Sequence, residues 1–254
     1  MFALDFTGSV VLVTGGTRGI GAGIAAAFLD AGAEVVICGR HAPEVLPEGG
    51  GRRAKFVEAD VRDAESVGSL VETVVDRHAR LDVLVNNAGG SPSADAATAS
   101  PRFSAAIIDL NLTAALHVSQ AANAMMQAGD GGCIVNVGSV SGLRPSPGTA
   151  AYGAAKAGLI NLTRTLAVEW APKVRVNCVS PGMILTELAE MHYGDDEGIA
   201  RVAATVPLGR LGSPADVAHA CMFLASPLAA YVNGANIVVD GGGERPAFLD
   251  AARH

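Results

Sequence analysis

The sequence predicts an α/β fold in which a parallel sheet carries helices on both faces, formed by a single domain over residues 1–254. Short runs of β-branched residues alternate with longer alanine-rich segments along the chain, which is typical of this class. A glycine-rich turn separates the first run from the first helical segment. The length of 254 residues, half of them apolar, suits one undivided domain of this kind.

Composition limits the classes of function. A formal net charge of −7 argues against a nucleic-acid binder, which normally presents a basic face to phosphates. The chain leaves no room for a cleavable leader before its first strand, and no uninterrupted apolar run reaches the roughly 18 residues of a membrane span. We therefore expect a cytoplasmic protein without membrane contact. Four cysteines lie far apart in apolar segments and predict free thiols and no metal site: Cys38, Cys133, Cys178 and Cys221.

The hydrophobic periodicity predicts seven strands and five helices. The strands are expected at residues 10–14, 34–38, 54–57, 83–86, 133–137, 174–178 and 237–239. The helices are expected near 19–31, 63–79, 102–128, 152–170 and 214–225. Between the second and third strands, Pro43, Pro47 and three glycines from Gly49 predict a turn or loop in place of a crossover helix.

The turn after the first strand has the pattern of a phosphate-binding loop. Glycines there let backbone N–H groups and a helix N-terminus approach a pyrophosphate, although a tight strand-to-helix turn explains the same pattern. The candidate binding residues in this turn are Gly15, Thr17, Arg18, Gly19, Ile20 and Gly21.

The end of the second strand indicates which dinucleotide is preferred. An acidic residue there would bind a free ribose 2′-hydroxyl, but this strand ends in Gly39 and Arg40. Arg40 and Arg18 suit a 2′-phosphate, so NADP is favoured, with NAD as the alternative; two arginines on a solvated rim are the competing explanation. After the third strand, Asp60 and Val61 either line the adenine edge or begin the next helix, with Asp60 as its cap.

Tyr152 and Lys156 have the spacing of a proton-transfer pair. Residues four apart share one helix face, and a nearby ammonium lowers the pKa of a phenol, as a general acid or base requires. Ser139, thirteen positions before Tyr152, supplies a hydroxyl that can hold a substrate oxygen. The spacing alone also fits an ordinary helix with an exposed lysine.

Taken together, the motifs resemble the short-chain dehydrogenase/reductase family. The resemblance covers residues 10–242 and rests on the following motifs in order: Thr14-Gly15 to Gly21, Asn86-Asn87-Ala88-Gly89, Asn111, Asn136 to Ser139, Tyr152 to Lys156, and Pro181-Gly182 with Thr186. It implies a seven-stranded Rossmann sheet and interconversion of carbonyls and alcohols with NAD or NADP.

The resemblance also implies a role for each matching residue. Tyr152 exchanges the proton, Lys156 lowers its pKa and binds the nicotinamide ribose, Ser139 orients the substrate oxygen, and Asn111 holds a water linked to Lys156. The segments expected to contact the dinucleotide are Asn87, Ala88 and Gly89 on the adenosine side, and Pro181, Gly182, Ile184 and Thr186 at the nicotinamide.

Residues 187–206 resemble the variable substrate lid of the family. Met191 and Tyr193 are expected to form an apolar wall of this lid, and Gly194 and Gly198 are expected to be its flexible points. The alternative is a surface helix with a solvated acidic face. Further pocket walls are expected from Val140, Leu143 and Met183, which suit an apolar small-molecule carbonyl compound.

Within the family, the run from Pro207 to Gly212 and the ending from Val239 to Gly242 look most like those of 3-oxoacyl thioester reductases. An acyl-carrier protein would meet little positive charge at residues 127–130, so a coenzyme A thioester or a free ketone is retained as substrate. A homotetramer packed through the helices near 102–128 and 152–170 is implied. A non-catalytic scaffold that senses NADP is the alternative from another class.

Overall fold

The computed structural model describes residues 4–246, 248 and 251. Its main sheet has the seven parallel strands that the sequence predicts, and their spatial order is β5-β2-β1-β6-β7-β8-β9. The strands are β1 Val10–Thr14, β2 Glu34–Gly39, β5 Lys55–Glu58, β6 Val83–Asn86, β7 Gly132–Val137, β8 Val174–Pro181 and β9 Asn236–Val239.

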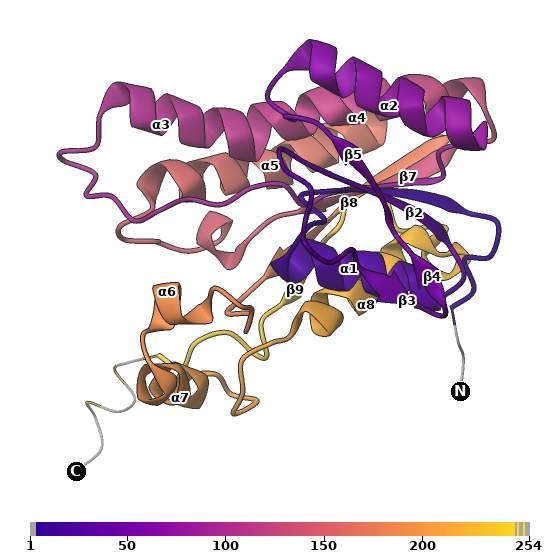
Figure 1. Ribbon diagram of the computed structural model, residues 1–254. Coiled ribbons are helices and arrows are strands. Elements are labelled where there is room, and N and C mark those ends of the chain that lie inside the picture. Colours follow the sequence, from indigo (N-terminus) through magenta and orange to yellow (C-terminus); the bar gives the residue numbers. More distant parts are fainter. Residues whose placement is uncertain (1–3, 247, 249–250, 252–254) are drawn as a thin grey trace.

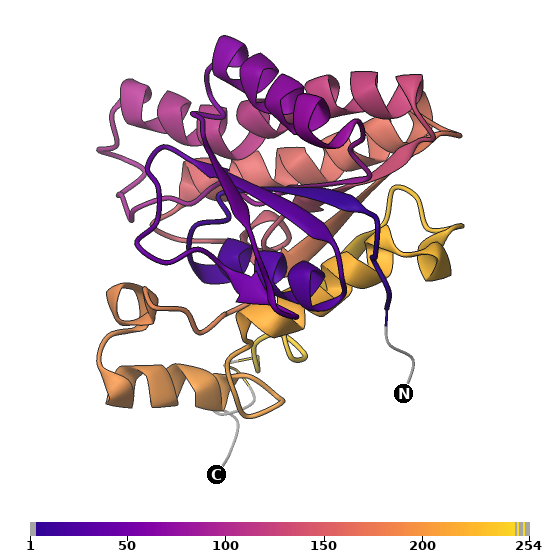
Figure 2. The same cartoon turned by 45° about the vertical axis from the view of Figure 1, so that its right-hand side comes forward.

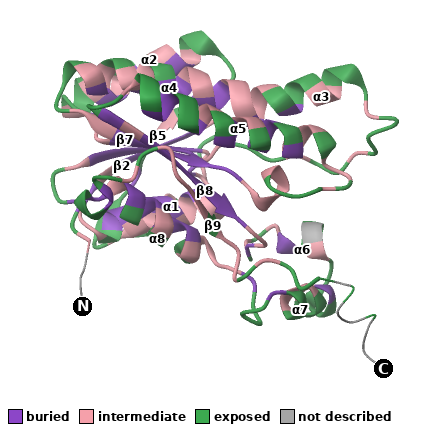
Figure 3. Cartoon of the chain, turned by 180° about the vertical axis from the view of Figure 1, so that it is seen from behind, coloured by how far each residue is buried: buried purple, intermediate pink, exposed green. Residues whose placement is uncertain are grey.

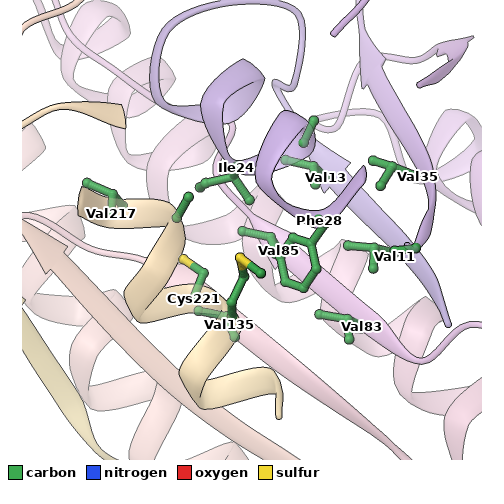
Figure 4. Packing of buried hydrophobic residues seen from close by; sticks show 14 of the residues in the cluster. Val11, Val13, Ile24, Phe28, Val35, Val83, Val85, Val135, Val217 and Cys221 are labelled. Carbon is green, nitrogen blue, oxygen red and sulfur yellow. The ribbon is translucent and has the colours of Figure 1, made fainter. Parts of the chain in front are cut away.

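Helices cover both faces of this sheet (Figure 1). Helices α1 Gly19–Asp30 and α8 Pro214–Ala225 lie on one face, and α2 Ala64–His78, α4 Ala114–Ala128 and α5 Ala150–Glu169 lie on the other. Alternate residues of β1 point to opposite faces of the sheet. Val11 and Val13 pack with Phe28 of α1 in one hydrophobic core, which Figure 4 shows, whereas Val10 and Leu12 belong to the core on the other face. Both faces are therefore buried, as expected for parallel strands.

The helix expected at 102–128 is divided by a π-helical turn. Helix α3 Pro101–Ile108 begins at its cap Ser100, and the turn Asp109–Thr113 separates it from α4. Within the turn, the Asn111 side chain donates to the Ile107 carbonyl at 2.9 Å, so a side chain occupies an acceptor of the helical ladder. Single-sequence periodicity does not register such a local change.

Residues 41–53 form no helix, as expected. They contain a short hairpin of β3 Glu48–Gly49 and β4 Arg52–Arg53. Strand β8 is longer than predicted, because residues Cys178 to Pro181 pair with β9 from the far end of the chain. That pairing partner is too distant in sequence to be recognised from a local pattern.

Two helices, α6 Ala189–Tyr193 and α7 Asp196–Thr205, follow β8 and stand apart from the sheet layers (Figures 1 and 2). The Asp195 side chain begins α7 by accepting from the Gly198 N–H at 2.9 Å. Most of α7 is exposed (Figure 3). The first turn of α7 carries the acidic residues Asp196 and Glu197, and the substrate lid expected at 187–206 stays a prediction.

The strand order reverses between β1 and β6. The chain proceeds outward from β1 through β2 to β5, then returns to β6 and proceeds in the opposite direction to β9. At such a switch point the loops diverge and leave a crevice at the carboxyl ends of the strands. The loops that carry the candidate residues all leave the sheet at this edge.

Candidate active site

Ser139, Tyr152 and Lys156 lie together at the carboxyl end of β7. Ser139 begins the 3-10 turn Val140–Gly142, where its Oγ accepts from the Ser141 N–H at 3.1 Å. Tyr152 and Lys156 lie one turn apart on α5, with Lys156 Nζ 5.6 Å from the centre of the Tyr152 ring. The Ser139 side chain hydrogen-bonds the Tyr152 phenol and so acts to lower its pKa.

Burial is the stronger influence on both titratable groups of this cluster. It raises the pKa of Tyr152 above its ordinary value, against the effect of Ser139. It lowers the pKa of Lys156 to about 8, with the nearby Cys178 acting in the opposite direction. The expectation that Lys156 lowers the Tyr152 pKa is wrong for this structure, because the ammonium donates at 2.8 Å to the Val137 carbonyl and desolvation of the phenol dominates.

Asn111 fixes the segment that follows β6. Its Oδ1 accepts from the Gly90 N–H at 2.8 Å, and its Nδ2 donates to the Gly90 carbonyl at 2.9 Å. A Cβ on Gly89 would come within 2.6 Å of Asn111 Oδ1 and 3.3 Å of Lys156 Nζ. Gly89 therefore fits closely between Asn111 and Lys156, and a larger residue would displace one of them.

The glycine turn is braced from β6. Asn87 Nδ2 donates to the carbonyls of Thr14 and Gly15 at 3.0 and 3.1 Å. The buried Thr14 hydroxyl accepts from the N–H groups of Asn87 and Ala88, both at 3.0 Å. These bonds hold the ends of β1 and β6 in fixed register beside the turn.

The shape of this turn fits a dinucleotide pyrophosphate. Gly15 has a φ of +62°, and a Cβ there would lie 2.9 Å from the Ala88 Cα; a Cβ on Gly21 would lie 2.3 Å from the Gly15 carbonyl oxygen. Arg18, the residue before α1, provides no side-chain cap. The first N–H groups of α1 thus do not donate to that side chain, as in helices that bind anions.

The end of β2 carries no acid at the expected ribose position. A Cβ on Gly39 would already lie 3.1 Å from Thr17 Cγ2, so a side chain fits there only with adjustment. Arg18 and Arg40 are both exposed. The charge of Arg40 also contributes to lowering the pKa of Asp60, so Arg40 lies on the same side of the site.

Asp60 is already paired with a neighbour. Both of its oxygens accept from the Arg62 guanidinium, at 3.0 and 2.5 Å, and this holds the pKa of Asp60 down at about 2. The alternative expectation that Asp60 caps the following helix is wrong, because Asp63 caps α2 by accepting from the Glu65 N–H. The cap lies three residues later than the pattern indicated.

The segment after β8 is paired with Gly212 on one side and contacts Tyr193 through the Ile184 backbone. Gly212 N–H donates to the Met183 carbonyl and Leu185 N–H donates to the Gly212 carbonyl, so the polar groups of Ile184 between them face the other way. The Tyr193 phenol, whose pKa is raised by burial, hydrogen-bonds the Ile184 backbone and lies near Tyr152. Met191 is 76% exposed, so it does not form the expected apolar wall.

A cavity of about 190 Å³ is lined in part by Val140, the residue that follows Ser139. All three pocket residues expected from the sequence line it: Val140, Leu143 and Met183. Gly182, expected at the nicotinamide, lines it as well, and sequence reasoning missed the remaining lining residues, which are Arg144, Val238, Asp240, Gly243 and Glu244. Arg144 follows Ser139 closely and so gave a weak signal, whereas Val238 to Glu244 reach the cavity only through the pairing of β9 with β8.

Comparison with known proteins gives the family. A family model described as enoyl-(acyl carrier protein) reductase matches residues 15–244. The solved structure of a short-chain type dehydrogenase/reductase from Mycobacterium ulcerans superposes with a TM-score of 0.87 at 31% identity, over 98% of this chain and 95% of that one. The chain belongs to the short-chain dehydrogenase/reductase family.

Other relatives show how widely this family varies in substrate. The chain is 38% identical to a 3-oxoacyl-[acyl-carrier-protein] reductase of Synechocystis, over 93% of this chain and 97% of the relative. The ligand-free structure of Thermoplasma acidophilum aldohexose dehydrogenase matches with a TM-score of 0.88 at 32% identity, over 95% and 96% of the two chains.

This short-chain dehydrogenase/reductase is therefore an oxidoreductase of the CH–OH/C=O couple that uses a nicotinamide cofactor. Members of the family act on small molecules and are typically oligomeric. Within the described residues, no helix is both long and apolar enough to cross a membrane. In the same part of the chain, no three His, Cys, Asp or Glu side chains gather in an arrangement that could hold a metal ion.

Proposed function

We propose that this enzyme uses NADP(H) to interconvert a ketone and a secondary alcohol, with Tyr152 as general acid and base. The observation that carries the proposal is the meeting of Tyr152, Ser139 and Lys156, together with a cavity whose lining includes Val140, the residue after Ser139. A proton donor, an oxygen-orienting hydroxyl and a largely apolar chamber are what carbonyl reduction requires of the protein.

The chain's own residues handle the proton and the geometry, while the nicotinamide supplies or accepts hydride directly. Burial keeps the Tyr152 phenol protonated near neutral pH, ready to protonate a carbonyl oxygen as negative charge develops on it. The Ser139 hydroxyl would orient that oxygen and stabilise the charge. Lys156 would bind the nicotinamide ribose, and Asn111 would hold the segment around Gly89 in place.

The dinucleotide would lie along the carboxyl edge of the sheet. The preference for NADP is supported by Gly39 at the position of the expected acid and by the exposed guanidinium groups of Arg18 and Arg40. The residues proposed to contact the cofactor are Gly15, Thr17, Arg18, Gly19, Ile20, Gly21, Arg40, Asp60, Val61, Asn87, Ala88, Gly89, Tyr152, Lys156, Pro181, Gly182, Ile184 and Thr186.

Reduction of a 3-oxoacyl thioester is a second candidate within this chemistry, favoured by the similarity to the Synechocystis reductase. The loop at residues 127–130 has more positive charge beside it than the sequence indicated. Lys173 Nζ donates to the carbonyls of Gln127 and Gly129 at 2.7 and 3.3 Å, so one exposed cation lies against the loop. A single cation gives limited attraction for an acidic carrier, so a coenzyme A thioester remains the simpler version.

We further propose a cytoplasmic homotetramer of single-domain subunits, with residues 187–206 as a substrate lid. The lid is supported by the approach of Tyr193 to Ile184 and Tyr152. Packing between subunits through α4 and α5 is supported by the small exposed residues Ala154 and Ala157 on α5, which permit close approach of a neighbour.

The test is a panel of substrates whose turnover is measured by the change in nicotinamide absorbance. Free ketones, 3-oxoacyl-coenzyme A thioesters, acyl-carrier-protein thioesters and hydroxysteroids are each assayed with NADPH or NADP and with NADH or NAD. Turnover that favours NADPH supports the proposal. Tight binding of NADPH without turnover of any member of the panel would instead indicate the sensing scaffold.

A further inference from the structure

The cavity that Val140, the residue after Ser139, helps to line has both apolar and charged lining residues. Val140, Leu143, Met183 and Val238 line the apolar part. Arg144, Asp240 and Glu244 supply the charged part, from the loop after β7 and from the chain beyond β9. A substrate bound next to Ser139 would extend between these two parts.

Arg144 and Glu244 form an ion pair across the charged side. The Arg144 guanidinium donates to the Glu244 carboxylate and, at 3.0 Å, to the Pro145 carbonyl. The two side chains are 40% and 42% exposed, so the pair lies at the rim of the cavity, within reach of solvent and of an entering molecule. It also joins segments a hundred residues apart in sequence.

The formal charges of the lining residues do not suit an anion. Of the described residues that line the cavity, Arg144 is the only cation, and Asp240 and Glu244 are both acidic. An entering carboxylate would need to displace Glu244 from Arg144, lose water against the apolar walls, and remain near Asp240. Because Glu244 is tethered to the same chain, its effective concentration at Arg144 exceeds that of a free competitor.

We propose that Glu244 is a specificity-determining residue: by neutralising Arg144, it reserves the cavity for uncharged carbonyl compounds and alcohols and excludes carboxylates. This inference rests on the proposed oxidoreductase function, and it names the substrate class of that site. It also assigns Arg144 as the residue that would bind an anionic substrate once Glu244 no longer carries a charge.

The experiment compares oxo acids with their methyl esters, in matched pairs of increasing chain length. Glu244→Gln keeps the size of the side chain and removes its charge. The double variant Arg144→Gln/Glu244→Gln removes the proposed anion site as well. Glu48→Gln is the control, because Glu48 forms an exposed ion pair with Arg53 on the β3–β4 hairpin, outside the set of cavity-lining residues.

We expect Glu244→Gln to raise the acid-to-ester ratio of kcat/KM at least about tenfold, and the double variant to lose this gain. Glu48→Gln should match the wild-type enzyme. Calorimetric titration with the same oxo acids gives a readout that does not need turnover, and Glu244→Gln should bind them about tenfold more tightly.

An unchanged ratio and an unchanged affinity in Glu244→Gln would overturn the proposal, as would a double variant that keeps the gain. The same experiment tests the proposed oxidoreductase function separately from the role of Glu244. If no ester is turned over by any variant but oxo-acid binding shifts as expected, the assignment of Glu244 stands and the oxidoreductase proposal for this cavity is wrong.

Discussion

The Nζ atom of Lys156 lies 5.6 Å from the centre of the Tyr152 ring and is held there by the Val137 carbonyl of β7. The ammonium is thus fixed to the sheet, on the helix that also carries the phenol. Its full burial is costly in free energy, since an ammonium loses hydration that one backbone carbonyl replaces only in part. A protein retains such a charge at a site where the charge has a use.

The burial of Lys156 predicts a pH-dependent stability. Its pKa falls from an ordinary 10.5 to about 8 in the folded protein, so between these values the unfolded chain binds more protons and stability rises with pH. Relative to Lys156→Met, the wild-type protein should gain about 2 kcal/mol between neutral pH and about pH 9.5. Urea unfolding of both proteins across this range measures the gain, and a difference that does not change with pH would contradict the assignment.

Thr14 is predicted to be a structural support of the cofactor turn. Thr14→Val keeps the shape but removes the acceptor of the Ala88 N–H and one of the two acceptors of the Asn87 N–H, the other being the Val85 carbonyl, which should cost about 1–3 kcal/mol of unfolding free energy. NADPH affinity should fall as well. Thr14→Ser retains the hydroxyl and serves as the control; equal losses in both variants would show that packing of the methyl group, and not the hydroxyl, is what matters.

Arg40 is predicted to recognise the 2′-phosphate that distinguishes NADP from NAD. Arg40→Ala should weaken NADPH binding at least about tenfold more than NADH binding, because only NADPH loses a charge-assisted hydrogen bond. Titration of protein fluorescence with each dinucleotide measures both affinities. Arg53→Ala, an exposed arginine on the β3–β4 hairpin, should leave both unchanged. Equal losses of NADPH and NADH in Arg40→Ala would mean that this side chain does not hold the phosphate.

The proposed tetramer predicts different effects for two similarly exposed valines. Val168 on α5 is 81% exposed and Val45 in the loop before β3 is 77% exposed. Val168→Glu should dissociate the tetramer by placing an unpaired charge in the α5 interface, whereas Val45→Glu should not. Light scattering with size exclusion gives the mass of each. A Val168→Glu protein of unchanged mass would place the interface elsewhere.

The seven-stranded parallel sheet was predictable from the sequence, because parallel strands buried on both faces, such as Val10–Thr14, read as continuous apolar runs. It placed Tyr152, Lys156 and Ser139 together because local spacing on α5 and a motif at the end of β7 suffice for that.

The sequence did not predict features that depend on pairing between distant segments or on the balance between opposing physical effects. Glu244 reaches the cavity only because β9 pairs with β8, and no local pattern marks that approach. The direction of the Tyr152 pKa depends on how desolvation compares with nearby charge, which requires coordinates. The pairing of Asp60 with Arg62, two residues away, was within reach of local reasoning and was overlooked.

Replacing Tyr152 by phenylalanine tests the proton-transfer role most directly. The substitution removes only the phenolic oxygen, so NADPH affinity, measured by fluorescence titration, should stay within about twofold of the wild-type value. Carbonyl reduction by the same protein should fall by at least about a thousandfold, because no other group takes the place of the proton donor. Rapid reduction by a Tyr152→Phe enzyme that binds NADPH normally would contradict the role of Tyr152 as general acid and base.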